Sequence, residues 1–346
     1  RNAQARAMRA RSGAERRAIA GPVQRLGPEE GPERVELDLG VGRVVELEAR
    51  TKQLQDQLAA EREMAQWRGQ TWLGRKLKSR LGFLRLYPPR TMTVSPPIPR
   101  SRGDEPRPTI AIVTPSLNSV AFLEATIRSV LAQDYPALEY VIQDGHSSDG
   151  SAELARRFAG GVVRVEFEHD SGQADAINRG FAKTSGDIMA WLNADDILLP
   201  GCLDYVARYF HHHPEIDLVY GHRIIIDAEG FEVARWIVPP HMPRAVSLAD
   251  YIPQETLFWR RRVWQRVGPL NDLFDFAFDW DFILRAQDAG FRFKRLPRFL
   301  GAFRVHEAQK TNVMAETGAA EMARIRRTRF GRDVDYKEIN RGLRLY

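Results

Sequence analysis

Two adjacent carboxylates follow a short apolar segment in the sequence WLNADD, which places Asn193, Asp195 and Asp196 close together. Unpaired carboxylates at the end of a buried strand are energetically unfavourable, and a hard divalent cation that also binds phosphate oxygens would compensate their charge. An aspartate at this place could instead cap a helix that begins near Pro200. The pattern alone therefore fits either a metal site or a helix cap.

Two further polar clusters follow apolar segments earlier in the chain. TPSLN (residues 114–118) offers short side chains and backbone groups to a nucleotide, and QDGHSSDG (residues 143–150) places Asp144 at a strand end. Helix capping explains Asp149, whereas Asp144 could accept hydrogen bonds from a nucleotide base. The first strand is not followed by GxGxxG, and GxxxxGK(S/T) is absent from the sequence. Dinucleotide-dependent redox chemistry and P-loop phosphoryl transfer are therefore disfavoured.

Strand and helix patterns alternate between these clusters. Short apolar runs predict strands at residues 109–114, 138–144, 162–168 and 187–192. Helices are expected at residues 119–133, 149–158, 173–183 and 200–212. This alternation predicts a mostly parallel sheet that helices cover on both faces. Ligands of such sheets bind at the carboxyl ends of the strands, which is where the three polar clusters fall.

The order of the clusters is more specific than any one of them. TPSLN, DGHSSDG, HDSGQADAINRGF, WLNADD and FDWDFILRAQDAGF follow one another between about residues 107 and 310. In this order they resemble the family-2 glycosyltransferases, which share the GT-A fold and transfer sugars from nucleotide-diphosphate donors. The resemblance implies an α/β domain of GT-A type, with a Rossmann-like sheet, over residues 107–346.

The resemblance also implies a metal site. Asp195 would be a metal ligand in a DxD-like motif whose first carboxylate is replaced by Asn193. His306 occupies the place where many GT-A enzymes bring a late histidine to the metal or the diphosphate, although a lone histidine is often only a surface residue. The implied cofactor is a divalent metal, Mn²⁺ or Mg²⁺, and a neutral imidazole suits Mn²⁺.

Other positions would bind the nucleotide-sugar by the same resemblance. The cation that meets the diphosphate is left open, because Ile177 stands where many relatives have arginine and Arg179 lies beyond it. The implied nucleotide-sugar-binding residues are Thr114, Pro115, Ser116, Asn118, Asp144, Asp170, Gln173, Asp175, Asn178, Asn193 and Asp196.

A candidate general base lies at a predicted helix start, in FDWD (residues 278–281). By the resemblance Asp279 would remove the proton of the attacking hydroxyl, which is otherwise a poor nucleophile. Asp281 is the alternative base, and both aspartates could merely cap the helix and favour its dipole. The acceptor-side residues that the resemblance implies are Gln254, Glu255 and Trp280, the last by stacking on a sugar face.

These roles predict an inverting, metal-dependent glycosyltransferase of polysaccharide or glycoconjugate synthesis. Its partners would be a nucleotide-diphospho-sugar donor and a saccharide or lipid-linked acceptor. The first alternative is a catalytically inactive nucleotide-sugar-binding or scaffold protein, because Asn193 and Phe278 depart from the family pattern. A third hypothesis is an adaptor for membrane surfaces or nucleic acid that acts through residues 1–108.

Positive charge is concentrated before the predicted domain. Residues 1–108 hold 22 Lys and Arg against 13 Asp and Glu, a net charge of +9. Residues 109–346 hold 29 against 32, a net charge of −3. The basic pI of about 9.5 therefore reflects the extension, and nucleic acid is not expected as a partner of the domain.

The extension divides into three predicted segments. Residues 1–43 are basic and poor in apolar side chains, so they are expected to be disordered. Residues 44–87 are expected to be helical, and residues 88–106 form a Pro-rich linker. Heptad-like spacing over 44–65 favours either a solvated helix or a homo-oligomer. The basic amphipathic pattern of 72–86 favours either a membrane surface or packing on the domain.

The single cysteine, Cys202, excludes an intrachain disulfide and any site that needs several thiolates. This composition fits a reducing compartment. Apolar runs all fall short of the ~18 residues that a membrane span needs. A cytoplasmic location is expected, with peripheral contact with the inner face of the membrane as an alternative.

Overall fold

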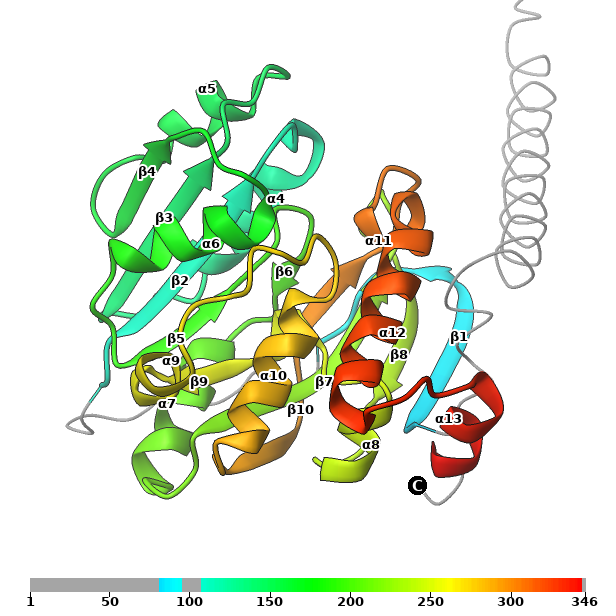
Figure 1. The fold of residues 1–346 in the computed structure, drawn as a ribbon. Helices are drawn as coiled ribbons and strands as arrows, with labels where there is room; N and C mark the ends of the chain where they lie inside the picture. Colours follow the sequence, from blue (N-terminus) through cyan, green and yellow to red (C-terminus); the bar gives the residue numbers. More distant parts are fainter. Residues whose placement is uncertain (1–80, 95–106, 344–346) are drawn as a thin grey trace, which may run out of the picture. The chain divides into compact units, whose positions relative to one another are not determined.

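The computed structural model describes residues 81–94 and 107–343, which form a 10-stranded sheet and the helices around it (Figure 1). The predictions of disorder for residues 1–43, of a coiled-coil-like helix for 44–65 and of a basic helix for most of 72–86 lie outside these residues. Among the residues described, no helix combines the length and the apolar character of a membrane span.

The first half of the domain contains the parallel part of the sheet. Its strands lie in the order β4-β3-β2-β5 and are all parallel. They are β2 (Ile110–Ser116), β3 (Leu138–Asp144), β4 (Val163–Phe167) and β5 (Ile188–Trp191). The helices of this half are α4 (Val120–Leu131), α5 (Ser151–Arg156), α6 (Gln173–Ala182) and α7 (Cys202–His212). Each of these elements was predicted, and its ends fall within two residues of the predicted ends.

The second half extends the sheet with strands of mixed direction. β9 (Phe258–Arg260) lies between β5 and β7 (Leu218–Ile226) and is antiparallel to both. β10 (Phe293–Arg304) is parallel to β7 and antiparallel to the short strand β6 (Ile197–Leu198). The remaining elements are β8 (Glu232–Ile237), α8 (Pro243–Leu248), the 3₁₀ helix η1 (Gln254–Thr256), α9 (Arg261–Val267), α10 (Phe278–Asp288), α11 (Lys310–Val313), α12 (Ala315–Phe330) and α13 (Tyr336–Leu343).

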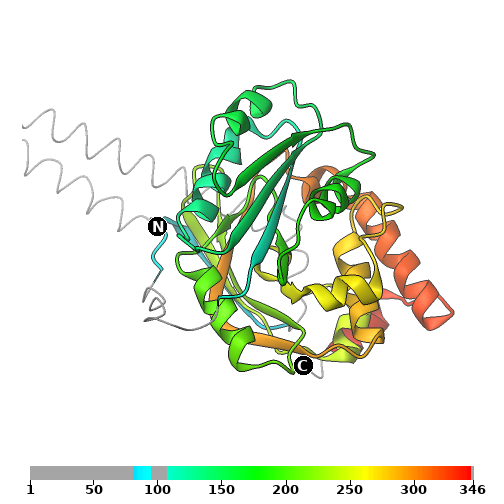
Figure 2. The same ribbon diagram turned by 90° about the vertical axis from the view of Figure 1, so that its left-hand side faces the viewer.

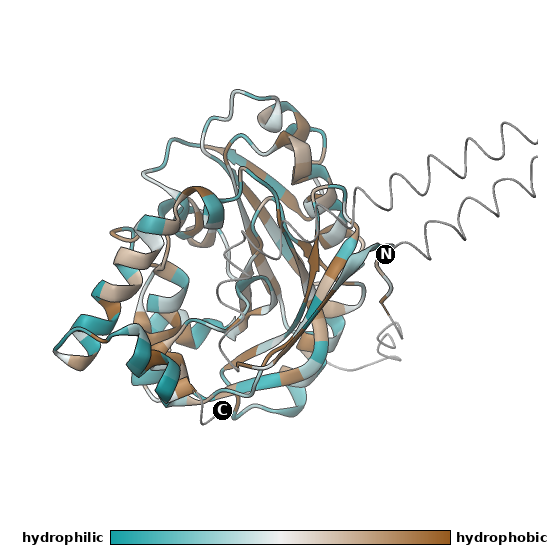
Figure 3. Cartoon of the chain, turned by 90° about the vertical axis from the view of Figure 1, so that its right-hand side faces the viewer, coloured by the Kyte–Doolittle hydropathy of each residue, from teal (hydrophilic) through white to brown (hydrophobic). Residues whose placement is uncertain are grey.

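Side chains of the parallel strands point alternately into two apolar cores, as the period of two of a strand requires. Ile112 and Ala190 belong to the core under α4, α5 and α7, whereas Val113 and Trp191 belong to the core under α6 and α10. Figure 2 shows these two helical layers on opposite sides of the sheet, and Figure 3 shows apolar residues concentrated along the central strands. Because both faces of β2, β3 and β5 are buried, these three strands have nearly continuous apolar sequences, whereas only Val163 is buried in the edge strand β4.

The start of the domain corrects a prediction. The basic amphipathic pattern of residues 72–86 favoured a helix, yet Phe83–Arg90 is strand β1 and pairs with β8 at the edge of the sheet. Leu84 and Leu86 pack against apolar side chains of β7 and β8. Their spacing of two residues serves a strand and was misread as part of a helical pattern. The sheet therefore begins before residue 107, inside the segment that was predicted as helix and linker.

Glu232 fastens β1 to β8. Its buried carboxylate accepts hydrogen bonds from the Tyr87 hydroxyl, from Arg90 Nη2 at 2.7 Å and from Arg235 Nε at 2.7 Å. Burial alone would raise the pKa of Glu232, but these hydrogen bonds from Arg235, Tyr87 and Arg90 outweigh it and lower the pKa to about 2. The stabilisation is therefore complete above the ordinary glutamate pKa of 4.5 and is lost as the pH falls from 4.5 toward 2.

We predict that Glu232→Gln lowers the free energy of unfolding by about 2 kcal/mol at pH 7, because two guanidinium groups lose a charged acceptor. The difference from the wild type should shrink below pH 4.5, because Glu232 is protonated there in the unfolded wild-type chain while it is still ionised in the folded one. Urea denaturation at several pH values measures both effects. Glu229→Gln, at an exposed position in the turn before β8, is the matched control. A difference that is as large at pH 3 as at pH 7 would contradict the assignment.

Candidate active site

A cavity of about 170 Å³ lies at the carboxyl end of β5, between η1, the start of α10 and the segment that follows β10. This is the edge of the sheet at which ligands of parallel α/β folds bind. Its lining combines carboxylates, amides and aromatic rings from segments that are far apart in the sequence. The predicted site residues that line it are Gln173, Asn193, Asp195, Asp196, Gln254, Glu255 and Asp279.

Asp195 and His306 are in contact at the edge of this cavity. Asp195 Oδ2 lies 3.1 Å from His306 Nε2, and the imidazole ring packs against the ring of Phe122 with centroids 4.5 Å apart. Antiparallel pairing of β10 with β6 brings together these two residues, which are 111 positions apart in the sequence. Sequence analysis predicted both as metal ligands, and the structure places them side by side.

This pair fits a divalent cation. A carboxylate oxygen and an imidazole nitrogen at this separation are ligand types that Mn²⁺ accepts. Over residues 81–94 and 107–343 no group of three or more His, Cys, Asp or Glu side chains could hold a metal ion. A cation held by Asp195 and His306 would therefore need further ligands from phosphate oxygens or water.

Asp196 supports the strand end from within the protein. It is 1% exposed, and its carboxylate accepts hydrogen bonds from Arg304 N at 3.0 Å and from Asn193 Nδ2 at 3.3 Å. Burial, together with the charges of Asp195 and Glu255, raises the pKa of Asp196 well above the usual range of a carboxyl group. Helix α7 begins after Gly201 rather than at either aspartate. The alternative of a helix cap is therefore wrong for both.

The hydrogen bonds of Asn193 explain why an amide replaces the first carboxylate of the DxD pattern. Its amide donates to Asp196 and accepts a hydrogen bond from Gln173 Nε2 at 2.8 Å. Gln173 Oε1 in turn accepts a hydrogen bond from Lys310 Nζ at 2.9 Å. A carboxylate at position 193 could not donate to Asp196 and would add negative charge beside a buried carboxyl. The amide is therefore the side chain that this arrangement requires.

Arg304 holds the main chain at Asp195, one of the two predicted metal ligands. Its Nε donates to the Asp195 carbonyl oxygen at 2.9 Å, and its Nη1 donates to the carbonyl oxygens of Asp227 and Ala228 at 3.1 and 3.0 Å. The guanidinium also lies 4.9 Å from the centroid of the Phe122 ring. Arg304 was not predicted from the sequence, because nothing in FRVHEAQKT distinguishes a buried arginine from an exposed one.

Asp279 is the aspartate of FDWD that reaches the cavity. It lies in the first turn of α10 and lines the cavity, and its Oδ1 accepts a hydrogen bond from Trp280 N at 2.7 Å. Asp281 accepts a hydrogen bond from Arg285 Nε at 2.8 Å and lines a different cavity. The structure therefore favours Asp279 over Asp281 as the candidate base, and Asp281 supports the helix.

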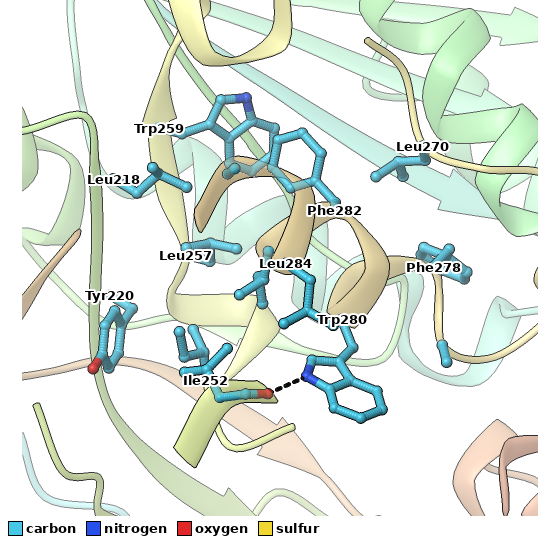
Figure 4. Close-up of a cluster of buried hydrophobic side chains, with 14 of the residues drawn as sticks. Leu218, Tyr220, Ile252, Leu257, Trp259, Leu270, Phe278, Trp280, Phe282 and Leu284 are labelled. Carbon is cyan, nitrogen blue, oxygen red and sulfur yellow. Dashed lines mark hydrogen bonds between the residues drawn. The ribbon is translucent and has the colours of Figure 1, made fainter. Parts of the chain in front are cut away.

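Trp280 does not lie where it was predicted. Its side chain is fully buried, and its Nε1 donates to the Val246 carbonyl oxygen at 2.7 Å (Figure 4). It shares the sheet-facing side of α10 with Ile283 and Leu284, at the spacing of one helical turn. The prediction that Trp280 stacks on an acceptor sugar is wrong, because this helix presents Asp279 to the cavity and Trp280 to the core.

Gln254 and Glu255 were predicted to lie on the acceptor side. The structure places both in η1, at the wall of the cavity. Glu255 is 2% exposed and forms a two-bond ion pair with the buried guanidinium of Arg223, whose Nε lies 2.8 Å from Oε1. Gln254 Nε2 donates to the Trp191 carbonyl oxygen at 2.8 Å. Gln254 Oε1 and Trp191 Nε1 are buried without a hydrogen-bond partner in the part of the chain that is described. Buried atoms of this kind are available to hydrogen-bond a water or a polar ligand.

The loops after β2, β3 and β4 form a second polar region. Asp144 is buried and accepts hydrogen bonds from Ser116 Oγ at 3.0 Å and from Ser147 Oγ and N at 2.7 and 2.8 Å. Asp170 lies beside the neighbouring Gly145, where an added Cβ would be 2.7 Å from Asp170 Oδ2, and burial together with nearby charges that include Asp144 raises the pKa of Asp170. The structure thus brings Asp144 and Asp170 together, while their contact with a nucleotide remains a prediction.

Several residues predicted to bind the nucleotide-sugar have structural contacts instead of a place at the cavity. Thr114 is buried and its hydroxyl lies 2.9 Å from the Tyr140 hydroxyl. The Asn178 amide pairs with both backbone groups of Leu270 at 2.9 Å. Asp175 accepts hydrogen bonds from Ser171 N and Arg179 Nε, and Asn118 Oδ1 accepts one from Ser148 N. Both polar groups of the Asn178 amide are bonded to the backbone of Leu270, so Asn178 departs most from its predicted role.

Asp149 caps helices, as its position in QDGHSSDG predicted. Its Oδ1 accepts a hydrogen bond from Ser151 N at 2.9 Å at the start of α5, and its Oδ2 accepts one from Val120 N at 2.9 Å at the start of α4. One carboxylate therefore ties together the first turns of two helices, where partial positive charge favours it.

The chain also resembles known proteins. A model of the family described as glycosyl transferase family 2 matches residues 111–269. A PGL/p-HBAD biosynthesis glycosyltransferase of Mycobacterium bovis is 32% identical over 182 residues, which is 51% of this chain and 69% of that relative. The chain belongs to glycosyltransferase family 2. This assignment agrees with the order of the motifs in the sequence and with the polar residues that line the cavity.

Other relatives of this glycosyltransferase are longer or more distant. The O-antigen biosynthesis protein RfbC of Myxococcus xanthus is 34% identical over 188 residues, 53% of this chain, but the chain spans 15% of RfbC. S. aureus TarS 1–349 in complex with UDP-GlcNAc has a TM-score of 0.53 at 16% identity and covers 68% of this chain and 70% of its own. Mannosyltransferase PcManGT from Pyrobaculum calidifontis, in complex with GDP-Man and Mn²⁺, has a TM-score of 0.53 at 17% identity and covers 71% and 72%. The fold is of GT-A type.

The position of Trp280 gives a testable prediction. We expect Trp280→Phe to lower the free energy of unfolding by about 1–3 kcal/mol, because the Val246 carbonyl loses its donor and the core loses volume. The KM for the acceptor should not change more than it does in Trp264→Phe, a matched change in α9 outside the cavity. Denaturation and steady-state kinetics measure the two effects. An acceptor KM that rises selectively in Trp280→Phe would restore the stacking role.

Proposed function

We propose that this glycosyltransferase is an inverting, metal-dependent enzyme that moves a sugar from a nucleotide-diphosphate donor to a hydroxyl of a saccharide or lipid-linked acceptor. One observation carries the proposal. Asp195, which is in contact with His306, lines the same cavity as Asp279. A candidate cation ligand and a candidate base thus line one cavity.

The known proteins support this class of substrates. Two structures with the same fold are complexes with nucleotide-sugars, UDP-GlcNAc for TarS and GDP-Man with Mn²⁺ for PcManGT. RfbC is named for O-antigen biosynthesis. These names support a nucleotide-sugar donor and a role in polysaccharide or glycoconjugate synthesis for this chain.

Asp279 would act on the acceptor. Its carboxylate would accept the proton of the acceptor hydroxyl as the oxygen of that hydroxyl bonds to the anomeric carbon. The bond from that carbon to the diphosphate breaks, and its electron pair leaves with the nucleoside diphosphate. A single displacement of this kind inverts the configuration of the anomeric carbon. Because Asp196 is buried and Glu255 is paired with Arg223, neither competes with Asp279 for this role.

Asp195 and His306 would hold the divalent cation. When bound there, the cation offsets the negative charge of the departing diphosphate. Arg304 fixes the main chain of Asp195, and Asp196 receives a hydrogen bond from the backbone of Arg304. These contacts keep the Asp195 carboxylate beside the imidazole before any ligand arrives, so less ordering is needed on binding.

We predict that Asp195→Ala lowers kcat/KM for sugar transfer by about 1,000-fold, because the cation loses its carboxylate ligand. His306→Gln should weaken the activation by Mn²⁺, while Glu307→Gln, which changes the exposed neighbour of His306, should not. Transfer from a panel of UDP- and GDP-sugars is measured with EDTA and after Mn²⁺ is restored. Undiminished transfer by Asp195→Ala in EDTA would remove the metal-dependent part of the proposal.

We also predict that Asp279→Asn lowers kcat by about 100- to 10,000-fold, because the amide cannot accept the acceptor proton. The matched variant Asp281→Asn should retain most of the wild-type kcat, since Asp281 lies on the other cavity. Proton NMR of the first product should show the inverted anomeric configuration. A retained configuration, or an Asp279→Asn enzyme as fast as the wild type, would be incompatible with this mechanism.

A further inference from the structure

Lys310 is a largely buried cation in the wall of the cavity. It is the first residue of α11 and lies four residues after His306 in the sequence. Its Nζ donates a hydrogen bond to Gln173 Oε1 at 2.9 Å and lies 5.4 Å from the centroid of the Phe278 ring. Within residues 81–94 and 107–343 it forms no ion pair, because no carboxylate oxygen comes within 4.0 Å of Nζ.

An ammonium group in this setting is incompletely satisfied. It carries three N–H donors, and the hydrogen bond to Gln173 uses one of them. Burial lowers the pKa of Lys310, while the charges of Asp275, Asp279 and Glu321 oppose that shift. A buried charge without a hydrogen-bonded counter-ion is unfavourable. The surroundings of Lys310 are therefore those of a group that an anionic ligand completes.

Among the residues that the structure describes, the arginines near the cavity already have partners. Arg223 forms a two-bond ion pair with Glu255, and the Arg304 guanidinium is bonded to main-chain carbonyl oxygens. Arg179, which the sequence left open as the cation for the diphosphate, is exposed and bonded to Asp175 at 3.0 Å. Arg179 is absent from the cavity lining, whereas Lys310 belongs to it.

We infer that Lys310 binds the diphosphate of the nucleotide-sugar donor and neutralises the charge that this group gains as the sugar leaves; this rests on the proposed function. The segment after β10 would then contact the diphosphate in two ways. His306 would act through the cation that it binds, and Lys310 would contact the diphosphate directly. The hydrogen-bond chain from Lys310 through Gln173 to Asn193 links the ammonium to the loop that carries Asp195.

The role of Lys310 in the transfer step is electrostatic. The bond between the anomeric carbon and the diphosphate oxygen breaks, and its electron pair remains on that oxygen. The acceptor oxygen forms the new bond to the anomeric carbon, and its proton goes to Asp279. The ammonium keeps its own protons and donates hydrogen bonds to the diphosphate, whose charge rises in the transition state.

The test compares nucleotides that differ by one phosphate. Calorimetry with Mn²⁺ gives the dissociation constants of UDP, GDP, UMP and GMP for the wild type and for Lys310→Met. We expect the preference for diphosphate over monophosphate to fall by about 10- to 100-fold in this variant, which is the usual weight of a charge-assisted hydrogen bond. The affinity for the monophosphates should change less than about twofold, and Lys310→Arg should keep most of the preference.

Two further variants keep the result decisive. Lys294→Met removes one positive charge from an exposed position of β10 and should leave the preference unchanged. Lys310→Gln replaces Lys310→Met if the latter does not fold. An unchanged preference in the Lys310 variants, or an equal loss for mono- and diphosphates, overturns the inference alone. A wild-type protein that binds neither UDP nor GDP with Mn²⁺ overturns the proposed function as well.

Discussion

Antiparallel pairing of β10 with β6 is the constraint on which the candidate site depends. It joins Gly301 to Leu198 and Ala302 to Ile197, and it thereby fixes the chain after β10 against the loop after β5. Gly301 also lets β10 approach η1 closely, because a Cβ there would lie 2.9 Å from both Cγ and the carbonyl oxygen of Glu255. β10 therefore contacts both β6 and η1. Asp195, Glu255 and the segment with His306 and Lys310 all follow from these contacts.

Several charged side chains around the cavity are held in place by ion pairs or hydrogen bonds. Glu255 is neutralised by Arg223, and Asp196 is buried with a raised pKa. The Asp195 carboxylate contacts an imidazole and its main chain is held by Arg304. Dipoles and charges that are fixed before a ligand binds need little reorganisation during a reaction. The rigidity of this side of the sheet is thus part of the proposed chemistry.

The sequence predicted the parallel half of the fold well and the other half poorly, for a physical reason. β2, β3 and β5 of the parallel half are buried on both faces, so each is a compact apolar run next to an amphipathic helix. β9 has 3 residues and β10 contains Pro297, and such strands are recognised only through their partners. In β1 the spacing of Leu84 and Leu86 was masked by basic residues that also fit a helix.

The candidate site was also predicted only in part from the sequence. The order of the motifs predicted Asp195, Asp279 and His306, and the structure places Asp195 and Asp279 at one cavity with His306 in contact with Asp195, while their roles stay predictions. The motif order could not tell the exposed side of α10 from its buried side, and so Trp280 was assigned to a sugar instead of to the core. The importance of Lys310 and Arg304 arises from contacts between distant segments, which no local pattern records.

The most direct test of the central claim is the position of Mn²⁺ in crystals grown with UDP or GDP, located by anomalous diffraction. We expect the ion to be coordinated by the Asp195 carboxylate and His306 Nε2, with the diphosphate bound to the same ion and Asp279 facing the same cavity. An ion held by other residues, with the nucleotide outside this cavity, would contradict the account of the site.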